Sequence, residues 1–220
     1  MNATISRATF DLSLYLVLDP DMCGGIAGMV RVTEAALNGG VTVVQLRAQG
    51  WRKRAFWDAA RMLQPLCRSH RVPLIINDHV DVALAIDADG VHIGQKDLPA
   101  NEARRLLGDK KILGVSVSNA QEWREVEAGA VDYIGVGPVW LTATKPEAGP
   151  ALGIDGLRAL LTTMKSSTTT MRTVAIGGIN VNNARSVMGT GVDGIAVVSA
   201  ICAGDAPEEA ARALCEVIGG

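Results

Sequence analysis

The chain has 220 residues, 48% of them hydrophobic, and a formal net charge of −2. This length and apolar fraction suit one domain with a large buried core, whereas the near-neutral charge argues against a nucleic-acid surface, which needs a clustered basic excess. No apolar run approaches the ~18 residues of a membrane span, and the first residues lack the layout of a signal peptide, so we expect a cytoplasmic protein with no membrane partner.

Segments of strand length alternate with segments of helical spacing along the whole chain. The expected strands, which are apolar and rich in β-branched residues, are residues 12–18, 41–46, 72–76, 88–93, 111–117, 131–136, 172–176 and 192–198. The expected helices are residues 52–70, 101–107, 120–128, 154–164, 181–188 and 207–218. Asn119 and Asn180 are placed to cap two of these helices.

Eight apolar strands separated by helices predict a parallel sheet covered on its outer face, and eight such units close naturally into a barrel. We therefore expect one α/β domain over residues 1–220, a single (β/α)₈ TIM barrel. A weak internal sequence repeat supports this: the similar segments 88–91, 131–134 and 192–195 each follow an expected helix and begin an expected strand. The alternative is an open doubly wound sheet, which the absence of a G-x-G-x-x-G after the first strand weakens.

The four cysteines are scattered and form no C-x-x-C pair, so we expect free thiols in place of disulfides or a zinc site. His92 lies inside an expected strand, where its side chain is expected to fill the barrel.

Polar residues gather at the carboxyl ends of successive expected strands, which is where barrels of this kind carry their chemistry. Those singled out are Gln45, Arg47, Asn77, Asp78, Asp97, Ser116, Thr142, Thr144, Lys145 and Ser199. Gly178 lets backbone amides approach a ligand closely, and the loops after the seventh and eighth strands are the usual phosphate site of such barrels. We therefore expect phosphorylated small-molecule ligands at this end.

Asp78 and Asp97 are the candidate metal ligands. Both are expected above the barrel mouth, and Mg²⁺ prefers a few carboxylates together with water and phosphate oxygens. The alternative is structural, with Asp78 capping the following helix and Asp97 lying in a turn.

Several segments together resemble the thiamine phosphate synthase family. They are residues 74–78 (LIIND), 90–99 (GVHIGQKDLP), 133–139 (YIGVGPV), 142–145 (TATK), 175–179 (AIGGI) and 197–201 (VVSAI). The resemblance implies a Mg²⁺-dependent transferase that condenses 4-amino-2-methyl-5-(diphosphooxymethyl)pyrimidine with 4-methyl-5-(2-phosphoethyl)thiazole. The implied products are thiamine monophosphate and pyrophosphate, and the implied path is dissociative, with pyrophosphate leaving first.

The resemblance also implies a role for each strand-end residue. Catalysis falls to Arg47, Lys145 and Ser116, and the metal to Asp78 and Asp97. The pyrimidine diphosphate is bound by Gln45, Arg47, Gln49, Asn77, Ser116 and Lys145. The thiazole phosphate is bound by Thr142, Thr144, Gly178, Val198 and Ser199.

Two positions depart from the family pattern. The family usually carries a lysine where this chain has Gln49, so either Arg52 or Lys53 substitutes for that cation or the diphosphate is bound more weakly. The family often carries a histidine where this chain has Ser118. There are two competing functions. One is that of a related thiazole tautomerase, which uses a histidine near the end of the fifth strand, where this chain has Ser118. The other is a non-catalytic barrel that binds thiamine precursors. A homo-oligomer, a fusion to another thiamine-pathway domain and a carboxylated thiazole all stay open.

Overall fold

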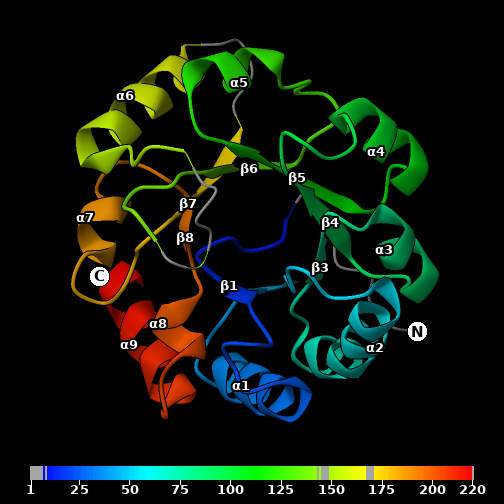
Figure 1. Cartoon of the computed structure of the whole chain (residues 1–220). Helices are drawn as coiled ribbons and strands as arrows, with labels where there is room; N and C mark the ends of the chain where they lie inside the picture. Colours follow the sequence, from blue (N-terminus) through cyan, green and yellow to red (C-terminus); the bar gives the residue numbers. More distant parts are fainter. Residues whose placement is uncertain (1–6, 8, 143, 145–148, 167–170, 220) are drawn as a thin grey trace.

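Eight parallel strands close into a barrel in the computed structural model of the chain (Figure 1). The structure describes residue 7 and residues 9–142, 144, 149–166 and 171–219. The strands are β1 (Leu14–Leu18), β2 (Val43–Leu46), β3 (Leu74–Asn77), β4 (Gly90–Ile93), β5 (Ile112–Val117), β6 (Tyr133–Val136), β7 (Arg172–Ile176) and β8 (Gly194–Val197). Each pairs with its neighbour in chain order, and β8 pairs back with β1. The expected (β/α)₈ barrel is confirmed, and the open sheet, which would leave two free edges, is excluded.

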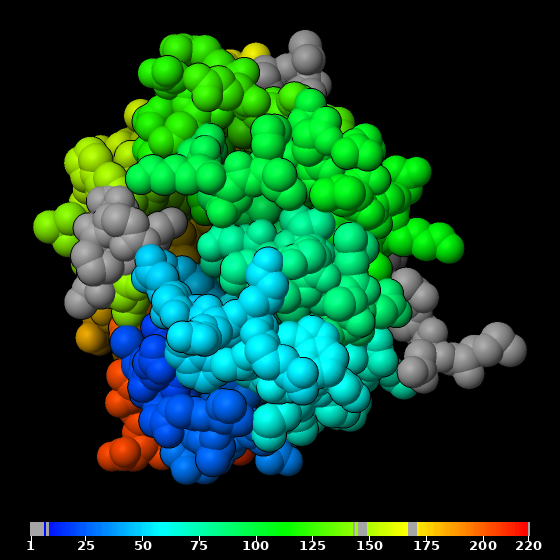
Figure 2. All heavy atoms as spheres, turned by 45° about the vertical axis from the view of Figure 1, so that its right-hand side comes forward, coloured from blue at the N-terminus to red at the C-terminus, as the bar shows by residue number. Residues whose placement is uncertain are grey.

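Helices surround the barrel on its outer face (Figure 1). They are α1 (Ile26–Asn38), α2 (Lys53–His70), α3 (Val80–Ile86), α4 (Ala100–Leu107), α5 (Ala120–Glu125), α6 (Gly153–Lys165), α7 (Ala184–Met188), α8 (Ser199–Cys202) and α9 (Pro207–Gly219). Figure 2 shows the face on which α2, α3 and α4 pack side by side. None of the described helices combines the length and hydropathy that a membrane span needs.

Three helices lie outside the segments expected from the sequence: α1, α3 and α8. The helix α1 buries Met29, Val32 and Ala36, which share one face at helical spacing. The other two have only seven and four residues, too short for a clear periodic pattern. Expected helix ends also moved, since α5 stops at Glu125 and α7 begins only at Ala184 with Asn183, not Asn180, at its N-cap.

The strands divide the buried side chains into two layers. The larger layer lies between the barrel and its helices, and it includes Leu14, Leu46 and Leu74. The smaller layer is made of alternate strand residues that point into the barrel, among them Tyr15 and Tyr133. All four cysteines are free thiols, as expected.

The internal sequence repeat has a structural cause. Asp89, Asp132 and Asp193 each precede an even-numbered strand, and the carboxylate of each accepts a backbone N–H from the strand before it. The donors are Leu74 N at 2.9 Å, Leu113 N at 2.8 Å and Thr173 N at 2.7 Å, respectively. The repeated aspartates therefore fasten pairs of strands at the amino end of the barrel and leave the opposite end to the functional loops.

Asn119 caps α5, and its loss should affect stability alone. Its Oδ1 accepts hydrogen bonds from Gln121 N at 2.9 Å and Glu122 N at 3.0 Å. Asn119→Ala is expected to lower the free energy of unfolding by about 1 kcal/mol and the melting temperature by roughly 2–4 °C. Thermal unfolding measures the effect. Asn119→Ser, which keeps an acceptor oxygen without placing a second carboxylate beside Glu122, should restore most of the melting temperature. An Asn119→Ala variant as stable as the parent would contradict the capping role.

Candidate active site

A cavity of about 560 Å³ opens at the carboxyl end of the barrel. Residues from several strand ends and the loops that follow them line it, and they include almost all described residues to which the sequence assigned a role. These are Gln45, Arg47, Gln49, Asn77, Asp78, Asp97, Ser116, Thr142, Thr144, Gly178, Val198 and Ser199. Lys145, the remaining predicted site residue, lies outside the described residues. The topology thus brings to one cavity residues more than 150 positions apart in the chain.

Arg47 connects two sides of this cavity. Its Nη1 donates to the Thr144 carbonyl at 3.0 Å, and its Nη2 donates to Gln49 Oε1 at 3.1 Å. The guanidinium is therefore held between the loop after β2 and the loop after β6. A planar group with five donors is suited to bind a diphosphate in this position.

The two candidate metal ligands both lie exposed in the cavity. Asp78 follows β3 in the left-handed conformation, with φ of 61°, and its N–H donates to the His92 carbonyl at 2.9 Å. The side chain of Asp78 does not cap α3, whose N-cap is His79. Asp97 lies in a turn after β4, as the structural alternative expected, and its Oδ2 accepts from Gly94 N at 2.8 Å. This bond engages one carboxylate oxygen and leaves the charge facing the cavity.

No cluster of three or more metal-ligating side chains occurs among the described residues. Two carboxylates nevertheless fit Mg²⁺, because that ion commonly takes one or two protein carboxylates and completes its six positions with water and substrate phosphate. The same pair would fit poorly to a metal that requires three or four protein ligands.

The threonines and Gly178 occupy the other side. Thr142 Oγ1 and Thr144 Oγ1 are hydrogen-bonded at 2.8 Å. Gly178 has φ of 65°, and a Cβ built there would lie 2.9 Å from the Cβ of Trp140. Glycine at this position is therefore needed by the backbone as well as by any ligand that approaches it.

The floor of the cavity is polar, which the sequence did not indicate. His92 is buried in the barrel, as expected, but both of its ring nitrogens have hydrogen-bonding partners: Tyr133 Oη and Ser116 Oγ, each at 2.9 Å. Tyr15 Oη lies 2.8 Å from Tyr133 Oη and accepts from Gln45 Nε2 at 2.7 Å. Tyrosine and histidine within apolar strands look like core residues in a sequence, so nothing in the pattern indicated this connection.

Two further residues line the cavity without a role assigned from the sequence: Lys96 and Glu122. Lys96 is exposed beside Asp97. Glu122 accepts the Ser118 hydroxyl at 2.8 Å and the Ser118 N–H at 2.7 Å. The hydroxyl of Ser118, one of the two departures found in the sequence, is thus bonded to a carboxylate of α5.

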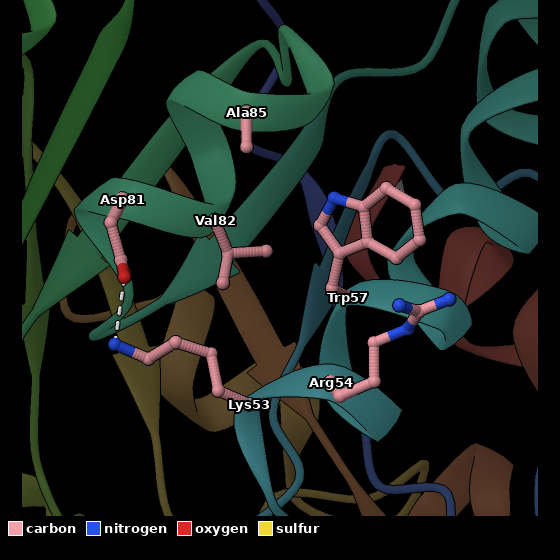
Figure 3. A pocket seen from close by; sticks show the side chains of 6 residues that line it. All are labelled: Lys53, Arg54, Trp57, Asp81, Val82 and Ala85. Carbon is pink, nitrogen blue, oxygen red and sulfur yellow. Dashed lines mark hydrogen bonds and ion pairs between the residues drawn. The ribbon is translucent and has the colours of Figure 1, made fainter.

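A second hollow, of about 310 Å³, lies outside the barrel between α2 and α3 (Figure 3). Lys53 points to Asp81 there, with Nζ 2.7 Å from Oδ2, while the Arg54 guanidinium lies over the Trp57 ring. Neither Arg52 nor Lys53 is among the residues that line the main cavity. The expectation that one of them replaces the missing cation therefore finds no support in their positions.

Comparisons with known proteins find relatives that match nearly the whole chain. A family model described as thiamine monophosphate synthase matches residues 14–201. A thiamine-phosphate synthase of Laribacter hongkongensis is 51% identical over 208 residues, which cover 94% of this chain and 96% of the relative. One from Clostridium novyi is 42% identical over 204 residues, covering 93% and 97%.

Solved structures give the same picture. A thiamine phosphate pyrophosphorylase from Pyrococcus furiosus superposes with a TM-score of 0.83 at 34% identity and covers 97% of both chains. A 3-hexulose-6-phosphate synthase superposes with a TM-score of 0.64 at 13% identity, covering 94% of this chain and 99% of the other, a likeness of fold alone.

Proposed function

The chain belongs to the thiamine monophosphate synthase family, and from this premise we propose how its cavity joins the two precursors. The expected activity, that of a thiamine-phosphate synthase in the transferase class, is confirmed by full-length relatives. The proposal covers the residue roles, the metal and the path. One observation carries it: a single cavity holds Arg47, two exposed aspartates and the Thr142–Thr144 pair.

The diphosphate of the pyrimidine substrate occupies the side of Arg47, Gln49 and Asn77. Its ring lies on the cavity floor, between Gln45 and Ser116. Arg47 binds the diphosphate and neutralises the negative charge that develops on the departing oxygen as the C–O bond breaks. Lys145 contributes a second positive charge. The electron pair of the broken bond leaves with pyrophosphate, and the 4-amino group of the pyrimidine donates electrons into the ring to stabilise the resulting cation.

The thiazole phosphate occupies the side of Thr142, Thr144 and Gly178, with Val198 and Ser199 closing the site after β8. Anchoring the phosphate there orients the thiazole so that its ring nitrogen attacks the pyrimidine methylene carbon. The new C–N bond forms without removal of a proton, so no strong protein base is needed. Positioning and charge stabilisation carry the reaction.

Asp78 and Asp97 would hold Mg²⁺. The bound ion would supply positive charge to the diphosphate oxygens.

One assay separates this function from its alternatives. The protein is incubated with both substrates and Mg²⁺, and thiamine monophosphate and pyrophosphate are quantified. Equal amounts of the two products are expected. Rearranged thiazole without coupling would indicate a tautomerase, which the bond between Ser118 and Glu122 disfavours. Binding of both substrates without turnover would indicate the non-catalytic barrel.

Gly178→Ala is expected to raise the KM for the thiazole phosphate about tenfold and to leave the pyrimidine KM nearly unchanged. The added methyl would press on Trp140 at 2.9 Å and so displace the backbone amides expected to approach the phosphate, and it would also strain the left-handed backbone by roughly 1–2 kcal/mol. Gly108→Ala is the matched control, because Gly108 has φ of 69°, has no atom within 4 Å of its would-be Cβ and does not line the cavity. Steady-state kinetics and thermal unfolding of both variants separate strain from binding. Equal KM changes for the two substrates would make Gly178 purely structural.

A further inference from the structure

Five polar side chains from five strands form a continuous hydrogen-bonded chain across the cavity floor. In order they are Gln45 on β2, Tyr15 on β1, Tyr133 on β6, His92 on β4 and Ser116 on β5. All five line the cavity, and all but the half-buried Ser116 are at most 8% exposed. The reaction proposed above uses the two ends, Gln45 and Ser116, and gives the three middle residues no role.

The barrel makes specific room for this chain. A Cβ at Gly114 would lie 2.1 Å from the Tyr133 ring, and a Cβ at Gly135 would lie 3.0 Å from Cε1 of His92. Burial also raises the pKa of both Tyr15 and Tyr133 above the usual range of a phenol. Both hydroxyls therefore keep their proton and can each donate one hydrogen bond.

The direction of donation follows from counting protons. Gln45 Nε2 donates to Tyr15, so the one proton of Tyr15 is available for Tyr133, and the proton of Tyr133 is then available for His92 Nδ1. A neutral imidazole that accepts at Nδ1 carries its proton on Nε2 and donates it to Ser116. Ser116 accepts within the chain, and its own proton is directed to the cavity.

Counting hydrogen bonds also determines which atom of Gln45, at the other end of the chain, faces a ligand. Gln45 uses its Nε2 on Tyr15, so its Oε1 is the group left for a ligand. Every buried side-chain nitrogen or oxygen of the described residues has a hydrogen-bond partner. Among the described residues, the side chain of Gln45 bonds only to Tyr15, through Nε2. Its Oε1 therefore cannot be fully buried, and it reaches the cavity that Gln45 lines.

We propose that Tyr15, Tyr133 and His92 are positioning residues that fix how the two ends of the cavity floor form hydrogen bonds with a ligand. They make Gln45 an acceptor and Ser116 a donor, and this polarity selects a 4-aminopyrimidine over its 4-oxo counterpart. The 4-amino group is a donor and the ring nitrogens are acceptors, which matches this polarity. The 4-oxo ring replaces the donor group with a carbonyl and carries a proton on a ring nitrogen, so it meets Gln45 and Ser116 with the wrong partners. This inference rests on the proposed function, which places the pyrimidine at this floor.

The first test needs no substrate. ¹⁵N NMR of the histidine rings in the whole protein, assigned by comparison with a His92→Gln variant, should show His92 as the neutral tautomer protonated on Nε2. Tyr133→Phe, which keeps the ring but removes the hydroxyl, should abolish this fixed tautomer. Tyr15→Phe breaks the chain on the far side of Tyr133 and should leave it in place. A parent protein protonated on Nδ1, or on both nitrogens, would overturn the proposal.

The second test measures selectivity by calorimetry. The probes are 4-amino-2-methyl-5-(phosphooxymethyl)pyrimidine and its 4-oxo counterpart, whose single phosphate is a poor leaving group. The parent should bind the amino compound more tightly, and both Tyr133→Phe and Tyr15→Phe should reduce the ratio of the two Kd values at least about tenfold. Having two variants guards against poor folding of either one.

Thr33→Val is the matched control, because it removes a buried hydroxyl, bonded to Met29 O at 2.8 Å, in α1 and outside the cavity. It should lower stability without changing the Kd ratio. An unchanged ratio in both phenylalanine variants would refute the inference even if the protein makes thiamine monophosphate. Absence of that product from the parent would instead refute the proposed function.

Discussion

Replacing Asp97 by asparagine is expected to lower kcat/KM for thiamine monophosphate formation by at least about 100-fold while the fold stays intact. Asparagine keeps the size of the side chain and an oxygen that can accept from Gly94 N, so the turn after β4 is preserved. It removes the negative charge that would bind Mg²⁺. Steady-state kinetics, with circular dichroism to verify folding, measure the effect.

The control for this variant is Asp81→Asn. Asp81 is an exposed aspartate in α3, but it pairs with Lys53 in the outer hollow and does not line the cavity. The Lys53 ammonium lowers the pKa of Asp81, which is therefore charged at neutral pH like any exposed aspartate. Its loss should leave turnover within about twofold, since surface ion pairs contribute little. Chelator should abolish activity of the parent and added Mg²⁺ should restore it. Full synthesis in excess chelator would refute the metal assignment.

The strand ends could be predicted because a parallel barrel forces eight carboxyl ends to one side. Once the eight apolar segments are identified, the residues at or just after their carboxyl ends, such as Arg47, Asp78 and Ser116, must face a common mouth. The periodic aspartates at 89, 132 and 193 could also be recognised, although only the structure gives their reason, a bond to the preceding strand.

The cavity floor could not be predicted in this way. Tyr15 and Tyr133 are 118 positions apart and lie on strands β1 and β6, which are not neighbours in the sheet. Their contact depends on the diameter of the barrel and on the space left by Gly114. No local pattern encodes such a contact, and burial alone makes a tyrosine look like an ordinary core residue. The same holds for Lys53, whose partner is decided by the packing of α2 against α3.

The departure at Gln49 leads to a gain of function. Gln49→Lys is expected to tighten binding of the pyrimidine diphosphate by roughly ten- to over a hundred-fold, the equivalent of about 1.5–3 kcal/mol for a well-placed charge-assisted bond. Gln49 lines the cavity and accepts from Arg47 Nη2 at 3.1 Å, so a lysine there would lie beside the guanidinium. The two cations repel each other in the empty site, and the bound diphosphate offsets that repulsion. The gain should therefore shrink as salt concentration rises.

Three alanine variants determine whether the cation is missing or has moved. Lys53→Ala should be neutral, because Lys53 pairs with Asp81 outside the barrel. Arg52→Ala should also be neutral, because Arg52 is exposed and does not line the cavity. Lys96 does line it, beside Asp97. If Lys96→Ala strongly weakens binding of the diphosphate and Gln49→Lys has no effect, the loop after β4 supplies the charge that the sequence led us to expect after β2. If Gln49→Lys tightens binding and all three alanine variants are neutral, the site is one cation short. If none of the four changes alters KM or kcat, the loop after β2 does not contact the diphosphate, and the placement of Arg47 beside it is wrong as well.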